Sequence, residues 1–199
     1  PDTGDGAGIL IQMPHEFMKK VCRNEGIDLP EKGEYGVGML FLSPDKETRE
    51  ESLSAFKEII EREGQTVLGI REVPVYEDCL GDSAYEAMPH IVQVFVGKSS
   101  DELSSEDFER RLYVILKLAE REIRKSGKDN YFYLSSFSCA TIVYKGMLTP
   151  NQVNEFYPDL KDTDMKTAIA LVHSRFSTQT VPSWERAHPN RYIIHTGEI

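Results

Sequence analysis

The most informative stretch of the chain is its C-terminal part, Val172-His-Ser-Arg-Phe-Ser-Thr-Gln-Thr-Val-Pro-Ser-Trp-Glu-Arg-Ala-His-Pro-Asn-Arg-Tyr-Ile-Ile-His-Thr-Gly-Glu-Ile199. An apolar run over residues 168–172 leads into a polar loop that contains Arg175. A second strand-like run, residues 192–194, leads into His195-Thr196-Gly197. Two strands that each deliver a polar loop to one region are a common way to build a small-molecule site.

Two residues of this stretch have chemistry suited to such a site. Arg175 can hold a carboxylate through two parallel hydrogen bonds. Gly197 allows its backbone to approach a ligand closely, so a free N–H can face developing negative charge. The competing interpretation of Arg175 is an ordinary surface ion pair. For Trp184, packing inside the loop competes with a role as a recognition platform.

Several long motifs resemble the glutaminase domain of glutamate synthase, a class-II glutamine amidotransferase with the N-terminal-nucleophile hydrolase fold. In the C-terminal stretch they are Arg175-Phe-Ser-Thr, Pro182-Ser-Trp-Glu-Arg-Ala-His-Pro and Tyr192-Ile-Ile-His-Thr-Gly-Glu-Ile. Upstream they are Thr3-Gly-Asp-Gly-Ala-Gly-Ile-Leu, Arg71-Glu-Val-Pro-Val, Arg111-Leu-Tyr-Val and Val143-Tyr-Lys-Gly-Met-Leu-Thr-Pro150. Together they run from end to end of the chain in the family's order.

The resemblance implies a fold and an activity. The fold would be α+β, a four-layer αββα sandwich with two stacked, mostly antiparallel sheets, incomplete at both ends of this chain. The activity would be hydrolysis of the glutamine side-chain amide to glutamate and ammonia for a partner synthase domain or subunit. Flavin (FMN) and an iron–sulfur cluster are expected only in that partner, and no cofactor is expected in this domain.

The resemblance also implies roles for individual residues. Arg175 would bind the substrate α-carboxylate, and Phe176, Ser177 and Thr178 lie where the family lines its glutamine pocket. Gly197 matches the glycine of the oxyanion hole. For His188, ordering a loop and touching the ligand are both open.

The chain departs from the family at two places. The family has Asn before the oxyanion glycine, whereas this chain has Thr196, whose side chain is shorter and β-branched. The family's catalytic Cys is the first residue of the mature chain, with its own α-amino group as base, and it would lie upstream of Thr3. We therefore expect residues 1–199 alone to be inactive. A non-catalytic structural or glutamine-sensing module is the alternative to the enzyme.

Composition and charge argue against several other classes of protein. The 199 residues, 40% hydrophobic and 28% charged, suit one globular domain with a sizeable core. A net charge of −10 argues against nucleic acid. No apolar stretch is long enough for a membrane helix, and no metal-binding motif occurs. The odd, widely spaced Cys22, Cys79 and Cys139 suit a reducing cytoplasm, with unpaired thiols.

Periodicity, caps and turn residues predict the elements along the chain. Strands are expected over residues 9–12, 35–42, 66–75, 91–96, 131–138, 141–144, 168–172 and 192–194. Helices are expected over residues 14–23, from the Ser43-Pro-Asp start to Gly64, from Ser104 or Ser105 to about Gly127, and from Thr149-Pro150 to Phe156. Residues 76–89 are expected to form a loop, and the strands on either side of Cys139-Ala140 to form a pair.

Overall fold

Three of the predicted helices begin where their capping residues indicate. In this computed structural model, which describes residues 6–100 and 103–195, α2 (Lys46–Arg62) follows Asp45, whose carboxylate accepts the Thr48 N–H at 2.9 Å. Helix α4 (Ser105–Ala119) follows Ser104, whose Oγ accepts the Asp107 N–H at 3.1 Å. Helix α5 (Pro150–Phe156) follows Thr149, with proline at its first position.

The first of two antiparallel sheets has four strands. In spatial order they are β3 (Thr66–Glu72), β4 (His90–Gly97), β2 (Tyr35–Leu42) and β5 (Tyr133–Ser138). Every neighbouring pair is antiparallel. Strands β2 and β4 are buried along almost their whole length, as expected for central strands of a sheet covered on both faces.

The second sheet has three strands, in the order β6 (Thr141–Lys145), β1 (Gly8–Gln12) and β7 (Ala170–His173). Strand β1 pairs with β7 so that Gly8 lies opposite His173 and Leu10 opposite Leu171. The expected pairing of the strands on either side of Cys139-Ala140 is wrong, because β5 and β6 belong to different sheets. The chain is thus α+β with two antiparallel sheets, as the sequence predicted.

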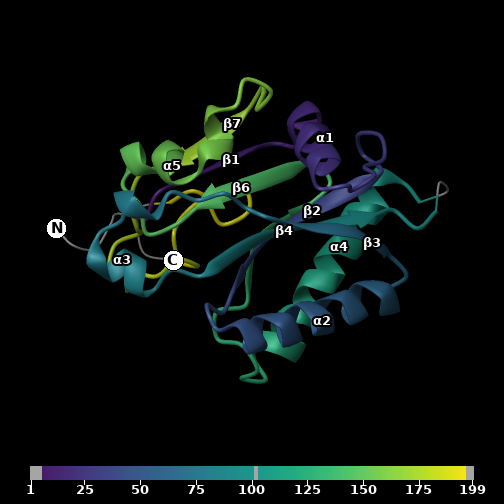
Figure 1. Cartoon of the computed structure of the whole chain (residues 1–199), viewed down its shortest axis with the longest axis horizontal. Coiled ribbons are helices and arrows are strands. Elements are labelled where there is room, and N and C mark those ends of the chain that lie inside the picture. Colours follow the sequence, from purple (N-terminus) through teal and green to yellow (C-terminus); the bar gives the residue numbers. More distant parts are fainter. Residues whose placement is uncertain (1–5, 101–102, 196–199) are drawn as a thin grey trace. The chain divides into compact units, whose positions relative to one another are not determined.

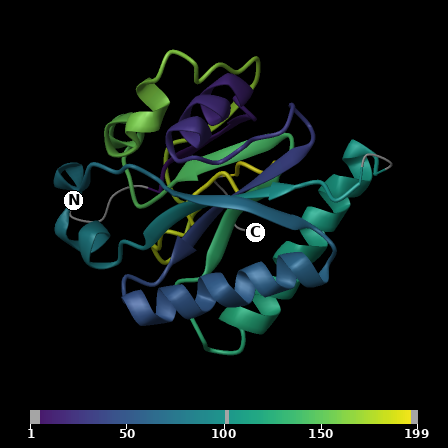
Figure 2. The same ribbon diagram turned by 45° about the vertical axis from the view of Figure 1, so that its right-hand side comes forward.

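The chain divides into two units. One, composed of Met18–Glu72 and Pro89–Ile142, contains the four-stranded sheet with α2 and α4 on one of its faces (Figures 1 and 2). Its core joins side chains of both helices to those of the sheet, and Leu112 and Ile115 of α4 are both 0% exposed. The other unit consists of Pro1–Phe17, Val73–Met88 and Val143–Ile199 and holds the three-stranded sheet. Helix α1 (His15–Asn24) begins in one unit and ends in the other.

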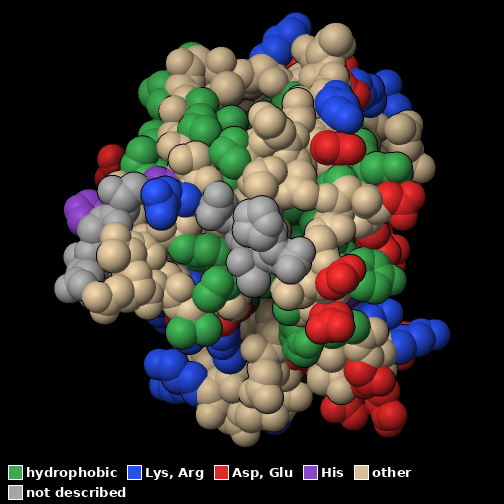
Figure 3. Space-filling view, turned by 90° about the vertical axis from the view of Figure 1, so that its left-hand side faces the viewer, with side chains coloured by type: hydrophobic (Ala, Val, Ile, Leu, Met, Phe, Trp, Pro, Cys, Tyr) green, Lys and Arg blue, Asp and Glu red, His purple; other side chains and the backbone are tan. Residues whose placement is uncertain are grey.

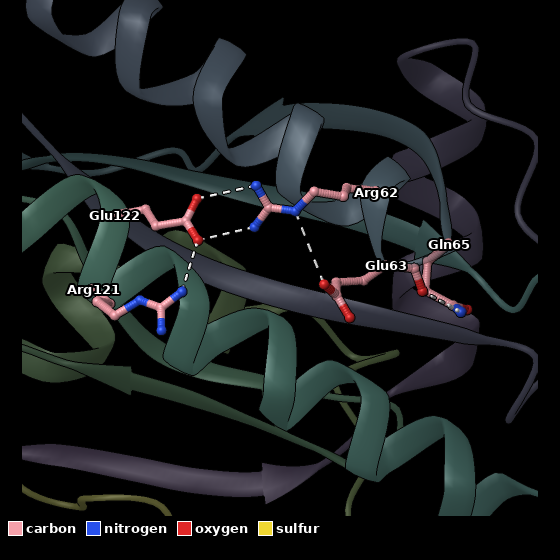
Figure 4. A network of polar contacts seen from close by, with 5 residues as sticks. All are labelled: Arg62, Glu63, Gln65, Arg121 and Glu122. Atoms are coloured by element: carbon pink, nitrogen blue, oxygen red, sulfur yellow. Dashed lines mark hydrogen bonds and ion pairs between the residues drawn. The ribbon is translucent and has the colours of Figure 1, made fainter.

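An arginine–carboxylate pair joins α2 to the π-helical segment η2 (Glu120–Arg124) that continues α4. The Arg62 guanidinium donates twice to the Glu122 carboxylate, at 3.2 and 3.0 Å, and Arg121 approaches the same carboxylate (Figure 4). The contact with Arg62 lowers the pKa of Glu122. Exposed pairs of this kind stabilise a fold only slightly, so the buried core determines how α2 and α4 pack.

Three segments differ from the sequence expectations. Strand β3 ends at Glu72, two residues before Pro74, which cannot donate to a sheet. The expected loop over residues 76–89 contains the short helices η1 (Glu77–Cys79) and α3 (Asp82–Glu86), and another, η3 (Pro158–Lys161), follows α5. Residues 192–194 form no strand: they lie in a tight turn closed by one bridge between Asn190 and Ile193.

Surface composition fits the charge of the sequence. On the face drawn in Figure 3, Lys and Arg side chains are interspersed with acidic and apolar ones, so the described residues there form no continuous basic field. None of the described helices is both long and apolar enough to cross a membrane. Within residues 6–100 and 103–195, no group of three or more His, Cys, Asp or Glu side chains is placed to hold a metal ion.

Candidate active site

Arg175 projects from the loop that follows β7. Its side chain is exposed, and it makes no ion pair or hydrogen bond with any residue that the structure describes. The interpretation of Arg175 as a surface ion pair therefore finds no partner within this part of the chain. A solvent-facing guanidinium without a carboxylate neighbour is available to bind an anionic group of a ligand.

Phe176 connects the Arg175 loop to the N-terminal segment. A Cβ atom placed on Gly6 would lie 2.4 Å from Cε1 of Phe176, so the ring occupies the space that a side chain at position 6 would need. The phenyl ring is itself half-buried. This contact places the N-terminal segment directly against the loop that carries Arg175.

Ser177 connects the same loop to the C-terminal segment. Its side chain is buried, and its hydroxyl donates to the carbonyl oxygen of His195 at 2.7 Å. The Ser177 Oγ also lies 2.9 Å from Nε2 of His188. Ser177 therefore contacts protein groups on two sides and holds the residue that directly precedes Thr196.

His188 is buried within the loop over residues 184–190, just before a cis peptide bond to Pro189. Its Nδ1 lies 3.4 Å from the carbonyl oxygen of Ile193, and the ring of His173 packs 4.7 Å away. Burial lowers the pKa of His188, and the neighbouring His173, Lys145 and His195 lower it further, whereas the Ile193 carbonyl raises it. The imidazole is therefore neutral at pH 7.

Lys145, at the end of β6, anchors the loop that contains His188. The side chain is fully buried, and Nζ donates to the carbonyl oxygen of Glu185 at 2.9 Å and to Oδ1 of Asn190 at 2.7 Å. Burial lowers its pKa to about 7. No role for this lysine was predicted from the sequence. A lysine that ends the otherwise apolar run from Ile142 to Tyr144 was the available signal.

Trp184 fixes the start of the same loop. Its indole is 3% exposed, and Nε1 donates to the carbonyl oxygen of Ala84 at 3.0 Å. The ring also fills the space beside Gly146, where a Cβ atom would lie 2.3 Å from Cζ3. The interpretation of Trp184 as a packing residue is confirmed.

His173 has an unusual environment. It is buried, and neither of its ring nitrogens has a hydrogen-bond partner among the described residues. It contributes to the wall of a cavity of about 330 Å³ between β1, β7 and α5, and most of the other wall residues are apolar. The cavity adjoins the predicted substrate site, because the ring of His173 packs 4.7 Å from that of His188.

Comparison with known proteins identifies the family. A profile of the class-II glutamine amidotransferases matches residues 1–199. This chain belongs to the class-II glutamine amidotransferases. It is 54% identical over 199 residues to the glutamate synthase [NADPH] large chain of Bacillus subtilis. The aligned region covers 100% of this chain and 13% of the Bacillus protein.

Eukaryotic glutamate synthases resemble this amidotransferase domain as well. Identity is 43% over 206 residues to glutamate synthase [NADH] of Saccharomyces cerevisiae, covering 99% of this chain and 10% of the yeast protein. It is 41% over 197 residues to ferredoxin-dependent glutamate synthase 2, chloroplastic, of Arabidopsis thaliana, covering 99% of this chain and 12% of the plant protein. The chain thus spans only 10–13% of the length of these relatives.

The amidotransferase domain brings most of its predicted site residues together. Phe176 and Ser177 adjoin Arg175, and His188 reaches the same place through its contact with Ser177. Thr178 is exposed on the same loop. Thr196 and Gly197 lie outside the described residues, so their roles stay predictions.

Proposed function

We propose that this domain hydrolyses the side-chain amide of glutamine to glutamate and ammonia, as the glutaminase part of a glutamate synthase. The observation that carries the proposal is the meeting of three segments at residues 175–177. Phe176 packs against Gly6, which follows the segment where the family has its nucleophile. Ser177 binds the His195 carbonyl, next to the predicted oxyanion residues Thr196 and Gly197.

In the proposed reaction, Arg175 binds the α-carboxylate of glutamine and so orients the side-chain amide. The family's N-terminal Cys attacks the amide carbon, its α-amino group accepts the thiol proton, and ammonia leaves as the thioester forms. The Gly197 N–H and the Thr196 hydroxyl stabilise the oxyanion. Water then hydrolyses the thioester and releases glutamate.

The finer architecture is also a proposal. Family membership supports the four-layer αββα arrangement, and α2 and α4 lie on one face of the four-stranded sheet, as such an arrangement requires. The low coverage of the relatives supports a synthase partner domain or subunit that uses the ammonia. We place the FMN and the iron–sulfur cluster in that partner, and the protein in the cytoplasm.

Thr196 favours a second candidate, a non-catalytic module that keeps the fold and binds glutamine. The experiment that separates the two uses the protein at its natural length and measures glutamate and ammonia release from glutamine alone. Release that disappears when the N-terminal Cys is changed to Ala supports the glutaminase. Glutamine binding by calorimetry without any release supports the module, and neither binding nor release contradicts both.

A further inference from the structure

We propose that Ser177 and His188 act as positioning residues. Together they form a hydrogen-bonded clamp on the backbone carbonyl of His195, the residue that leads into Thr196-Gly197. This inference rests on the proposed function, because the oxyanion role of Thr196 and Gly197 belongs to it. It gives Ser177 and His188 a role other than contact with glutamine.

The clamp is a continuous row of polar contacts. It runs from the Ile193 carbonyl to His188 Nδ1 at 3.4 Å, from His188 Nε2 to Ser177 Oγ at 2.9 Å, and from Ser177 Oγ to the His195 carbonyl at 2.7 Å. Ser177 is 9% exposed and His188 3% exposed, so little water competes for these contacts. The His195 carbonyl thus accepts a hydrogen bond from the clamp, and the Ile193 carbonyl lies near the imidazole.

The clamped segment has little other regular support. The strand predicted over residues 192–194 does not form, and one bridge from Asn190 to Ile193 takes its place. The side chains of Tyr192, Ile193 and Ile194 are exposed, so apolar packing against the described residues does little to fix this backbone. The hydrogen bond from Ser177 to the His195 carbonyl, with His188 orienting the Ser177 hydroxyl, therefore takes over the task that a sheet ladder would perform.

Counting protons assigns the tautomer of His188. A carbonyl only accepts, so the single Ser177 hydroxyl proton points to His195 at 2.7 Å. The Ser177 oxygen then accepts a proton from His188 Nε2, and the neutral ring carries its hydrogen there. Nδ1 then carries no hydrogen and forms no hydrogen bond with the Ile193 carbonyl 3.4 Å away, which accepts the Asn190 N–H at 3.0 Å.

Contacts from Lys145 and Gly8 hold the loop that contains His188. Lys145 binds Glu185 and Asn190, which lie on either side of His188 in the sequence. The backbone of Gly8 passes so close that a Cβ atom there would lie 2.5 Å from the His188 carbonyl oxygen. Both contacts hold the backbone around His188 in place, and a positioning residue needs such support.

The test compares Ser177→Ala with Ser183→Ala in the protein at its natural length. Ser183 is a matched control, because its buried hydroxyl has no hydrogen-bond partner among the described residues. We expect Ser177→Ala to lower kcat for glutamine hydrolysis about ten- to a hundred-fold, since a displaced catalytic segment misaligns its donors. KM should change by less than about threefold, because the lost contact orients groups needed in the transition state.

Two further measurements keep the test decisive. Backbone amide hydrogen exchange over residues 192–195 should be faster in Ser177→Ala than in the wild type and unchanged in Ser183→Ala. His188→Gln should retain more activity than His188→Ala, because a side-chain amide can still donate to Ser177. If Ser177→Ala does not fold, the glutamine and alanine variants at His188 give the same comparison.

The possible outcomes separate the clamp from the proposed function. A rise in KM with unchanged kcat in Ser177→Ala would show that Ser177 contacts glutamine and would overturn the clamp. Unchanged exchange together with unchanged kcat would overturn it as well. If the wild type releases no glutamate, the proposed function fails and the catalytic purpose of the clamp fails with it, while exchange still decides whether the clamp exists.

Discussion

The fully buried Lys145 Nζ donates to Oδ1 of the half-buried Asn190 across 2.7 Å. The second acceptor, the Glu185 carbonyl, is also uncharged. A neutral amine still has two N–H groups and can supply both acceptors. The loop over residues 184–190 can therefore remain anchored after this lysine loses its proton.

The first prediction follows from the pKa of Lys145, which burial lowers from 10.5 to about 7. Between these pH values the unfolded chain binds more protons than the folded one, so the folded state gains stability as pH rises. The difference in unfolding free energy between the wild type and Lys145→Met should rise by about 1.4 kcal/mol per pH unit from pH 7 to 9. Urea unfolding of both proteins at several pH values measures this difference in unfolding free energy. A difference that stays flat with pH for Lys145→Met would contradict the prediction.

The second prediction concerns Arg175. Arg175→Ala should weaken glutamine binding by about 2–4 kcal/mol, because two charge-assisted hydrogen bonds to the α-carboxylate disappear. The unfolding free energy should hardly change, since Arg175 has no partner among the described residues. Calorimetry and thermal unfolding give the two quantities. Arg175→Lys should bind with intermediate affinity, and equal affinity in Arg175→Ala would refute the carboxylate assignment.

The third prediction concerns the thiols, all of which are free in the structure. Burial raises the pKa of Cys22 to about 12, and burial together with Glu109 raises that of Cys139 to about 12. Because the thiolate is the reactive form, both should resist a thiol reagent at pH 8 in the folded protein. The half-buried Cys79 should react first. All three should titrate after unfolding without a reductant, and fewer would indicate a disulfide.

The fourth prediction concerns Thr196, where the family has Asn. A side-chain amide reaches further than a threonine hydroxyl, and one oxyanion donor contributes about two to three powers of ten in rate. Thr196→Asn should therefore raise kcat for glutamine hydrolysis with little effect on KM. Steady-state kinetics of the protein at its natural length measures this. An unchanged or lower kcat would show that this oxyanion assignment is wrong.

The fifth prediction tests the packing of Trp184. Gly146→Ala should destabilise the fold by about 1–3 kcal/mol, because the added methyl group would overlap the indole ring. In a Trp184→Phe background the same change should cost less, since the smaller ring leaves room for the methyl group. Circular dichroism in urea gives the four free energies. If Gly146→Ala lowers the unfolding free energy equally in both backgrounds, overlap with the indole ring is not the cause of the loss.

The elements that the sequence predicted well are those defined by local chemistry. Asp45 and Ser104 supply acceptors for helix N–H groups within their own first turn, so the helix starts follow from neighbouring residues. The apolar run over residues 192–194 was misassigned as a strand, because a strand also needs a partner and no described strand pairs with it. The pairing of β1 with β7 likewise depends on residues far apart in sequence.

In the candidate site, too, local motifs were predicted and contacts between distant residues were not. Family motifs placed Arg175, Phe176, Ser177 and His188 in one region, and the structure brings them together. The contacts of Ser177 with His195, and of Lys145 with the loop containing His188, were not predicted. They join residues 18 and 40 positions apart, respectively, and no local pattern specifies such pairs.

The pairing of β1 with β7 also determines the order in which the two sheets can fold during translation. Strand β1 leaves the ribosome before its partner Ala170–His173, which is made more than 150 residues later. The four-stranded sheet needs nothing beyond Ser138 and can assemble earlier. During translation, the apolar residues Ile9 and Ile11 therefore lack their β7 partner until residues 170–173 have been made. A ribosome that stalls before residue 170 would hold a finished four-stranded sheet beside an open strand, the kind of edge that chaperones recognise and that aggregation begins from.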